Sequence, residues 1–188
     1  MKSLGLSPDI NPGVYRNGEW VMGSGSVVES VSPHTGEVIG TTQLGSGSDY
    51  NSCVEAMDEE KRRWMAMPAP ARGEIVRQIG EALREKKDAL GSLLALEVGK
   101  IKTEGDGEVQ EYIDICDMAV GMSRTISGKV IPSERPEHMM MECWNPIGPI
   151  GVISAFNFPC AVGGWNTAIA LIAGDSVIMK GAESTSLL

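Results

Sequence analysis

The spacing of hydrophobic residues divides the chain into a β-rich beginning, a helical middle and an alternating end. Residues 1–48 are rich in Gly, Ser, Pro and Asn and contain short runs of residues that favour strands. Asn17-Gly18 separates two such runs and is a typical two-residue hairpin turn. We expect further strands over residues 27–31 and 37–44. This part therefore predicts a small antiparallel sheet beside a larger body.

From Asp49 onward, apolar residues recur at the three- and four-residue spacing of helices. The segment 49–127 predicts a helical layer, in which Asp49 can cap the first helix and Gly99 is a typical left-handed cap. By itself such a layer indicates only a structural role. The four helices expected are 49–67, 71–90, 90–98 and 105–125.

Residues 147–188 have the pattern of a strand, a helix and a second strand. The unbroken apolar run 147–156 predicts a strand covered on both faces, and residues 175–180 predict a second buried strand. With the helix between them they predict a βαβ unit with parallel strands. Catalytic and cofactor groups of such sheets lie at the carboxyl ends of the strands, so the polar Asn157 is the first candidate for chemistry.

Glycines in this unit do not form a dinucleotide fingerprint. Gly148 and Gly151 lie before or inside the first strand, whereas G-x-G-x-x-G would stand between strand and helix. Gly163 and Gly164 fall inside the helix, where we expect them to allow close packing.

Composition narrows the classes of partner. The net charge of −9 disfavours nucleic acid and anionic membranes, because both require a basic surface. No apolar run reaches the ~20 residues of a membrane span. The polar start lacks a signal-peptide core, and the first arginine is Arg16, which disfavours a transit peptide. We expect a cytoplasmic protein.

Four widely spaced cysteines and two histidines make a zinc site improbable, and we expect no metal. We expect buried, inert thiols; the even count leaves disulfides open, although they are unusual in the cytosol. The cysteines are Cys53, Cys116, Cys143 and Cys160.

Several motifs resemble the aldehyde dehydrogenase superfamily: I-G-V-I-S-A-F-N-F-P at 150–159, the turn at Gly174, and V-I-M-K-G-A-E at 177–183. Within it, W-N-P-I-G at 144–148 and L-E-V-G-K at 96–100 resemble the antiquitin branch, the α-aminoadipic semialdehyde dehydrogenases. The resemblance covers nearly the whole chain. It identifies the chain as similar to an amino-terminal fragment that lacks the catalytic domain, because complete members are more than twice as long.

The resemblance implies an α/β fold, namely the truncated amino-terminal part of an aldehyde dehydrogenase. Its parts are a β apron (1–48), the helical layer (49–127), an oligomerisation strand or arm (128–146) and the first, incomplete βαβ of a Rossmann-like NAD-binding domain (147–188). Such enzymes form homo-oligomers, here expected as a dimer or a homotetramer.

In this family a cysteine thiolate attacks the aldehyde, hydride passes to NAD(P)+, and water activated by a glutamate releases the acid. The resemblance makes Asn157 the donor that stabilises the oxyanion. The alternative is an Asn that caps the following helix. Cys160 matches a position that is apolar in relatives, so we do not expect it to be the nucleophile. The family thiol and glutamate lie downstream of this sequence.

Cofactor residues are also implied by the resemblance. Ser154, Ala155 and Phe156 match the segment beside the adenosine, and Lys180 matches a lysine that bonds the adenosine ribose. Glu183 favours NAD over NADP, since a carboxylate repels a 2′-phosphate. Without the resemblance these are ordinary strand residues and a solvated lysine.

Substrate selection would fall to Glu111, Phe158 and Trp165: the carboxylate would pair with an ammonium group and the aromatic rings would line the aliphatic stem. The alternatives are a solvated acidic residue and a core tryptophan.

The sequence thus predicts NAD-dependent oxidation of an amino-acid semialdehyde, of the kind found in lysine catabolism, by the complete enzyme. This chain alone is expected to be inactive. The alternative is a truncated, non-catalytic partner of full-length subunits.

Overall fold

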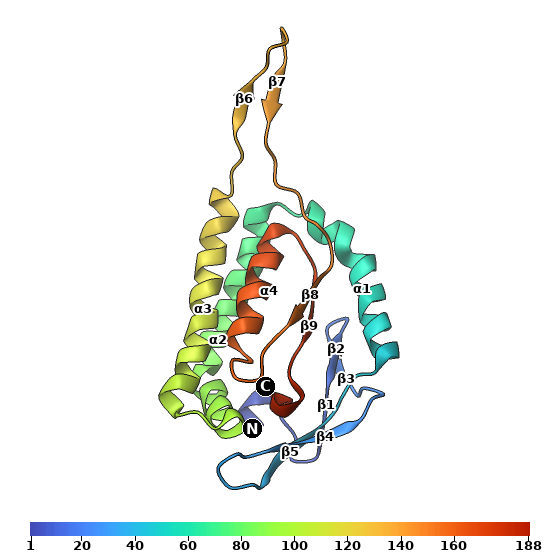
Figure 1. Ribbon diagram of the computed structural model, residues 1–188, viewed down its shortest axis with the longest axis vertical. Helices are drawn as coiled ribbons and strands as arrows, with labels where there is room; N and C mark the ends of the chain where they lie inside the picture. The colour runs from blue at the N-terminus through green and yellow to red at the C-terminus, as the bar shows by residue number, and fades with distance from the viewer.

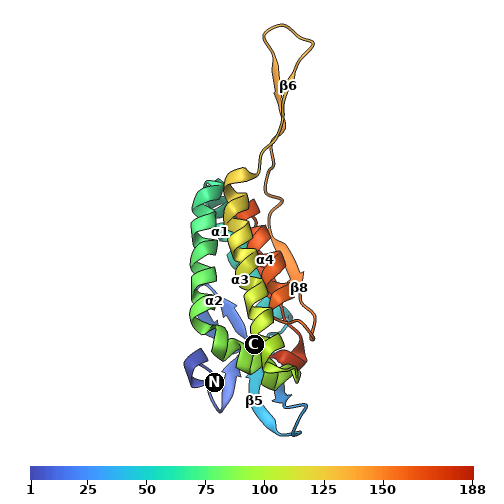
Figure 2. The same cartoon turned by 90° about the vertical axis from the view of Figure 1, so that its left-hand side faces the viewer.

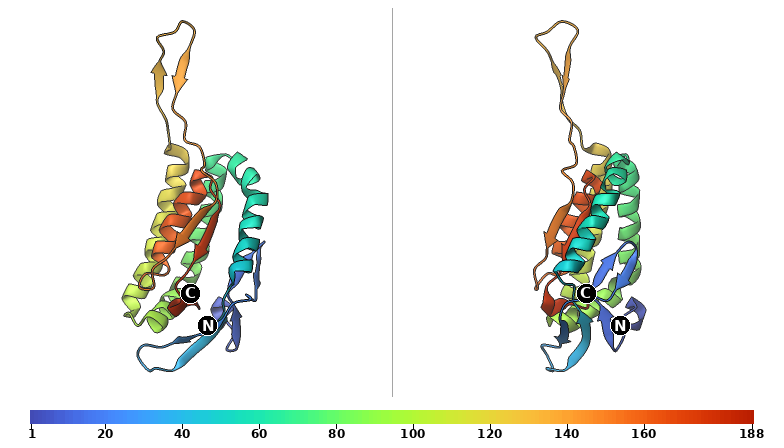
Figure 3. Two further views of the ribbon diagram at one scale, coloured as in Figure 1. Left: turned by 45° about the vertical axis from the view of Figure 1, so that its right-hand side comes forward. Right: turned by 90° about the vertical axis from the view of Figure 1, so that its right-hand side faces the viewer.

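Four helices form the body of the molecule in the computed structural model, which describes residues 1–188 (Figure 1). They are α1 (Gly47–Ala66), α2 (Ala69–Val98), α3 (Lys102–Thr125) and α4 (Ala161–Ala173). Helices α2, α3 and α4 pack side by side, and α1 stands apart from them across the pair of strands β8 and β9 (Figures 1 and 3). None of these helices combines the length and apolar character needed to cross a membrane.

Local capping sets the helix ends. Ser46, not Asp49, is the N-cap of α1, and Asp49 completes a capping box by accepting from the Ser46 amide at 2.8 Å. Helix α2 ends at Gly99, whose φ of +81° is the left-handed conformation expected there.

The separate helices expected over 71–90 and 90–98 are wrong, because α2 runs unbroken from Ala69 to Val98. No proline stands at the expected junction, and the single glycine there does not interrupt the helix. Gly91 remains helical and lets α3 come close, since a methyl group there would lie 3.0 Å from the Asp106 Cα. The glycine near residue 90 therefore indicates a close contact between α2 and α3 and not the end of a helix.

The core lies where α2, α3 and α4 meet. Two clusters of fully buried side chains fill it: Val76, Cys116, Ala119, Ala168 and Ile172 in one, and Leu94, Val109 and Ile113 in the other.

The amino-terminal apron consists of two small sheets. The strands β2 (Val14–Arg16) and β3 (Glu19–Val21) form a hairpin, whose turn residues Asn17 and Gly18 have φ of 51° and 84°. The other sheet has the order β1-β5-β4, formed by Ile10–Pro12, Val38–Gln43 and Val27–Val31. Strands β4 and β5 are antiparallel as predicted, but β1 pairs parallel with β5. Strands β2, β3 and β4 lie between β1 and β5 in the sequence, so the chain can re-enter the sheet at β5 in the direction of β1. Short 3-10 helices stand at Lys2–Leu4 (η1) and Glu183–Thr185 (η2).

The predicted βαβ unit is present. Strands β8 (Ile150–Ile153) and β9 (Val177–Lys180) pair in parallel, α4 connects them, and Gly174 ends α4 with φ of +102°. Strand β8 is shorter than predicted, because Gly148 has φ of +108° and Pro149 offers no N–H. Burial on both faces is wrong as well: Val152 is buried, whereas Ile153 is 79% exposed.

A hairpin projects from the body between α3 and β8 (Figures 1 and 2). It is formed by β6 (Val130–Pro132) and β7 (Met139–Met141), which pair antiparallel. Every residue of the two strands is exposed, although most of them are apolar. We call residues 128–146 the arm.

Candidate functional site

The carboxyl ends of β8 and β9 bring the predicted cofactor residues to one edge. The Ser154 amide donates to the Lys180 carbonyl at 3.1 Å, which continues the ladder one step beyond the strands. Ala155, Phe156 and Lys180 are exposed, and Glu183 opens η2 shortly after β9. The Ser154 side chain is buried, and its Oγ has no hydrogen-bond partner. This edge therefore offers a free lysine and exposed backbone to a ligand, whereas the Ser154 hydroxyl faces the interior.

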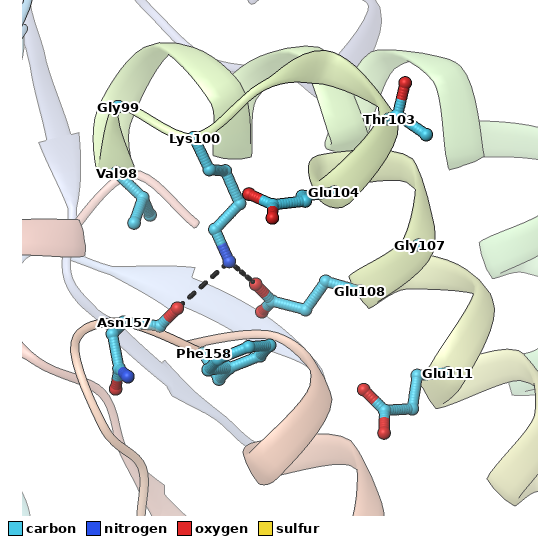
Figure 4. A pocket seen from close by; sticks show the side chains of 10 residues that line it. All are labelled: Val98, Gly99, Lys100, Thr103, Glu104, Gly107, Glu108, Glu111, Asn157 and Phe158. Atoms are coloured by element: carbon cyan, nitrogen blue, oxygen red, sulfur yellow. Dashed lines mark hydrogen bonds and ion pairs between the residues drawn. The ribbon is translucent and has the colours of Figure 1, made fainter.

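A hollow of about 630 Å³ lies beside that edge, between the start of α3 and the turn that leads into α4 (Figure 4). Glu111 and Phe158, two of the three predicted substrate residues, line it together with Asn157. The remaining lining residues are Val98, Gly99, Lys100, Thr103, Glu104, Gly107 and Glu108.

Trp165 does not belong to this hollow. It is 38% exposed and lines a second, largely apolar hollow with Ile115, Ile153 and Ile169. The fold thus brings two of the predicted substrate residues together and places the third elsewhere. Trp165 is neither a core residue, as the alternative expected, nor part of the hollow that contains Glu111 and Phe158.

A buried ion pair closes the floor of the first hollow. Lys100 Nζ lies 2.6 Å from Glu108 Oε1, and their side chains are 9% and 0% exposed. The ammonium also donates to the Asn157 carbonyl at 3.0 Å and lies 4.3 Å from the centre of the Phe158 ring (Figure 4). Cation and ring at this distance attract each other.

Glu108 caps α4 from a different helix. Its Oε2 accepts from the amides of Cys160 at 2.7 Å and Ala161 at 3.1 Å, whereas the N-cap residue Cys160 contributes no side-chain bond. The capping role considered for Asn157 is therefore filled by Glu108. The Asn157 carboxamide is exposed, makes no hydrogen bond and points away from Lys100 (Figure 4).

Burial and the neighbouring Glu108 carboxylate raise the pKa of the Cys160 thiol to about 12, although Lys100 opposes the shift. A thiol that stays protonated at neutral pH is a poor nucleophile. This supports the expectation that Cys160 does not attack the substrate.

All four cysteines are free thiols, but they are not all buried. Cys116 is buried and Cys53 is half-buried, whereas Cys143 is exposed. The expected burial is wrong for Cys143, because it lies on the arm, which does not pack against the body.

Sequence reasoning missed Lys100 and Glu108. A signal for Glu108 was present: it shares one face of α3 with the buried residues Gly105, Val109 and Ile113. A carboxylate within an apolar helical stripe must be paired when it is buried. Nothing local in the sequence names Lys100 as the partner. No group of three or more His, Cys, Asp or Glu side chains is arranged to hold a metal ion.

Comparison with known proteins decides the family. The sequence model of the aldehyde dehydrogenase family matches residues 20–188. The chain belongs to this family. Two curated relatives are each 54% identical to this aldehyde dehydrogenase chain over 188 residues and all of its length. They are the aldehyde dehydrogenase family 7 member A1 of Pisum sativum and the α-aminoadipic semialdehyde dehydrogenase of Bos taurus. The chain spans 37% and 34% of their lengths, respectively.

Solved structures agree on the fold. A point mutant of Staphylococcus aureus betaine aldehyde dehydrogenase, in complex with NAD+, superposes with a TM-score of 0.87 at 28% identity. The match covers 92% of this aldehyde dehydrogenase chain and 35% of that structure. The α/β architecture is therefore that of the amino-terminal portion of an aldehyde dehydrogenase.

Proposed function

We propose that this chain is part of an enzyme that oxidises an aldehyde to a carboxylate with NAD+. The observation that carries the proposal is the Asn157 carboxamide, which is exposed, free of hydrogen bonds and placed between the hollow and the strand ends. An unbonded amide donor is available to stabilise the oxyanion that forms when a nucleophile adds to an aldehyde. We propose that the nucleophile is not Cys160, whose thiol pKa is raised, but a cysteine in the remainder of the enzyme.

The edge formed by β8 and β9 fits the adenosine half of a nicotinamide dinucleotide. The exposed Lys180 can bond ribose hydroxyls, and the backbone of Ser154, Ala155 and Phe156 would lie beside the adenosine. Glu183 favours NAD+ over NADP+, because a carboxylate repels a 2′-phosphate. When bound, the nicotinamide ring would accept the hydride that the aldehyde loses.

The substrate we propose is an amino-acid semialdehyde of the α-aminoadipic type, which places the enzyme in lysine catabolism. Glu111 is half-buried in the hollow and would pair with the substrate ammonium, while Phe158 would cover its aliphatic stem. Trp165 would contact the substrate only if the substrate-binding region extended beyond the first hollow. The identity to the Bos taurus relative supports this substrate class.

The apolar, exposed arm supports assembly into a homodimer or homotetramer, since a surface of this kind is usually covered by a partner. We also propose a cytoplasmic location, which rests only on the amino-acid sequence.

Substitution of Asn157 tests the proposal in the complete protein encoded by the reading frame that carries this chain. Removing one oxyanion donor typically lowers kcat by about 10²–10³-fold. We expect Asn157→Ala to lower kcat for an amino-acid semialdehyde by that order, with little change in KM. Asn145→Ala is the matched control, because Asn145 is exposed and lines neither hollow. A kcat equal to that of the control variant contradicts the proposal.

The second candidate is a non-catalytic partner that pairs with full-length subunits through its exposed arm. Either candidate predicts that the purified 188-residue chain does not reduce NAD+ with an aldehyde above a buffer control. Sequencing the transcript beyond codon 188 separates them. A continuing frame with a cysteine and a glutamate supports the enzyme, and a natural stop codon supports the partner.

A further inference from the structure

The turn that carries Asn157 is held by two charged side chains that lie on neither β8 nor α4. We propose that Lys100 and Glu108 form a positioning pair that fixes the backbone from which the Asn157 carboxamide projects. The inference rests on the proposed function, in which that carboxamide is the oxyanion donor.

The pair contacts the turn on both sides of Pro159. Before it, Lys100 binds the Asn157 carbonyl at 3.0 Å and lies over the Phe158 ring. After it, Glu108 accepts from the amides of residues 160 and 161 at 2.7 and 3.1 Å. Pro159 has no N–H and a fixed φ. The backbone on both sides of the turn is therefore fixed by one ion pair.

Every polar group of the pair is used on the turn or on the partner. One Glu108 oxygen takes the ammonium at 2.6 Å and the other takes both amides. By contrast, the nearby Lys102 is 39% exposed and bridges Asp88 and Asp106, neither of which touches the turn. Buried charges are costly unless they are paired. The Lys100–Glu108 pair is buried where it contacts the backbone of the turn that carries Asn157.

The pair also keeps the carboxamide free. Asn is a favoured helix cap, and Asn157 stands three residues before the first amide of α4 that Glu108 binds. Because Glu108 already satisfies the amides of residues 160 and 161, the Asn157 side chain has no backbone donor to bind. Its carboxamide is left exposed and free of hydrogen bonds.

The test uses Lys100→Met and Glu108→Gln in the complete protein, each alone and combined with Asn157→Ala. A misplacement of about 1 Å can cost about 10²-fold in rate. We expect each single variant to lower kcat by about tenfold or more, with a smaller change in KM. Groups that act as a unit are not additive. In the Asn157→Ala background, the same substitutions should therefore lower kcat by less than about twofold.

Lys102→Met is the matched control, because it removes a lysine from the same segment without touching the turn. Hydrogen–deuterium exchange gives a readout independent of activity. Exchange of the peptide that covers residues 157–164 should become faster in Glu108→Gln and stay at the wild-type rate in Lys102→Met. Lys100→Arg, which keeps the charge, should restore part of the lost kcat.

The outcomes separate the two proposals. If Asn157→Ala alone leaves kcat unchanged, the proposed function fails and the positioning role fails with it. If Asn157→Ala lowers kcat, but the pair variants either keep wild-type kcat or lower it equally in both backgrounds, only the positioning role is overturned. If Lys100→Met does not fold, the isosteric Glu108→Gln decides by the same criteria.

Discussion

Helix α4 contacts α3 where the Tyr112 ring lies against Gly164. A methyl group on Gly164 would overlap the root of the ring, with Cδ1 only 2.7 Å away and two further ring carbons closer still. These atoms belong to the rigid part of a largely buried side chain, so the ring cannot swing aside. Gly164→Ala should therefore push α4 away from α3.

The size of the effect follows from two opposing contributions. Overpacking a well-filled core costs about 1–3 kcal/mol, and the rigid ring places this case at the upper end. Replacing a helical glycine by alanine returns about 1 kcal/mol. We expect a net loss of about 2 kcal/mol in the free energy of unfolding. For a chain of this length, the loss corresponds to a fall in Tm of about 4–8 °C.

Urea unfolding followed by far-UV circular dichroism, with calorimetry for Tm, measures this loss. Gly121→Ala is the control, because Gly121 lies on the exposed face of α3 and a methyl group there meets nothing within 4 Å. It should gain up to about 1 kcal/mol from helix propensity alone. If Gly164→Ala is as stable as Gly121→Ala, the packing argument is refuted.

Three further predictions concern buried polar groups. Arg72 donates from Nε and Nη2 to one carbonyl at the end of α4, at 3.2 and 3.0 Å; Arg72→Met should cost about 1.5–3 kcal/mol in urea unfolding, whereas the exposed Arg77→Met should cost little. Equal losses would contradict this role. At neutral pH a thiol reagent should modify the exposed Cys143 much faster than Cys160, whose pKa is raised to about 12; peptide mapping by mass spectrometry would show otherwise if the two rates are equal. Burial raises the pKa of Glu97 above its ordinary value, so the stability linked to its protonated form is present below that ordinary value and is lost as the pH rises through the folded pKa. Glu97→Gln should therefore be more stable than the wild type near pH 7 but not near pH 4, and a pH-independent difference would argue against the shift.

Features with local causes could be predicted from the sequence. The Asn17-Gly18 turn, the Gly99 and Gly174 helix ends and the strand–helix–strand order need only neighbouring residues to specify them. The close packing at Gly164 was also correctly expected, because a glycine that remains in a helix usually has a packing reason.

Features that join distant segments could not be predicted in this way. The parallel pairing of β1 with β5 depends on how the chain returns, and the continuity of α2 through Gly91 depends on the approach of α3. Exposure of Ile153 depends on what packs beside β8, which an apolar run does not specify. In the candidate site, the family motif indicated Asn157. The side chain that caps α4 in its place is Glu108, which binds amides 52 and 53 residues further along the chain.

The cap that Glu108 places on α4 bears on how the molecule acquires its structure. A βαβ segment of residues 147–188, produced as a peptide, would begin its helix with two unsatisfied amides and lack the cation beneath Asn157. We therefore expect the turn to become ordered only when α3 is docked against it. Transplanting the strand–helix–strand segment into another scaffold would therefore carry across the proposed cofactor edge but not the ion pair that holds the Asn157 backbone.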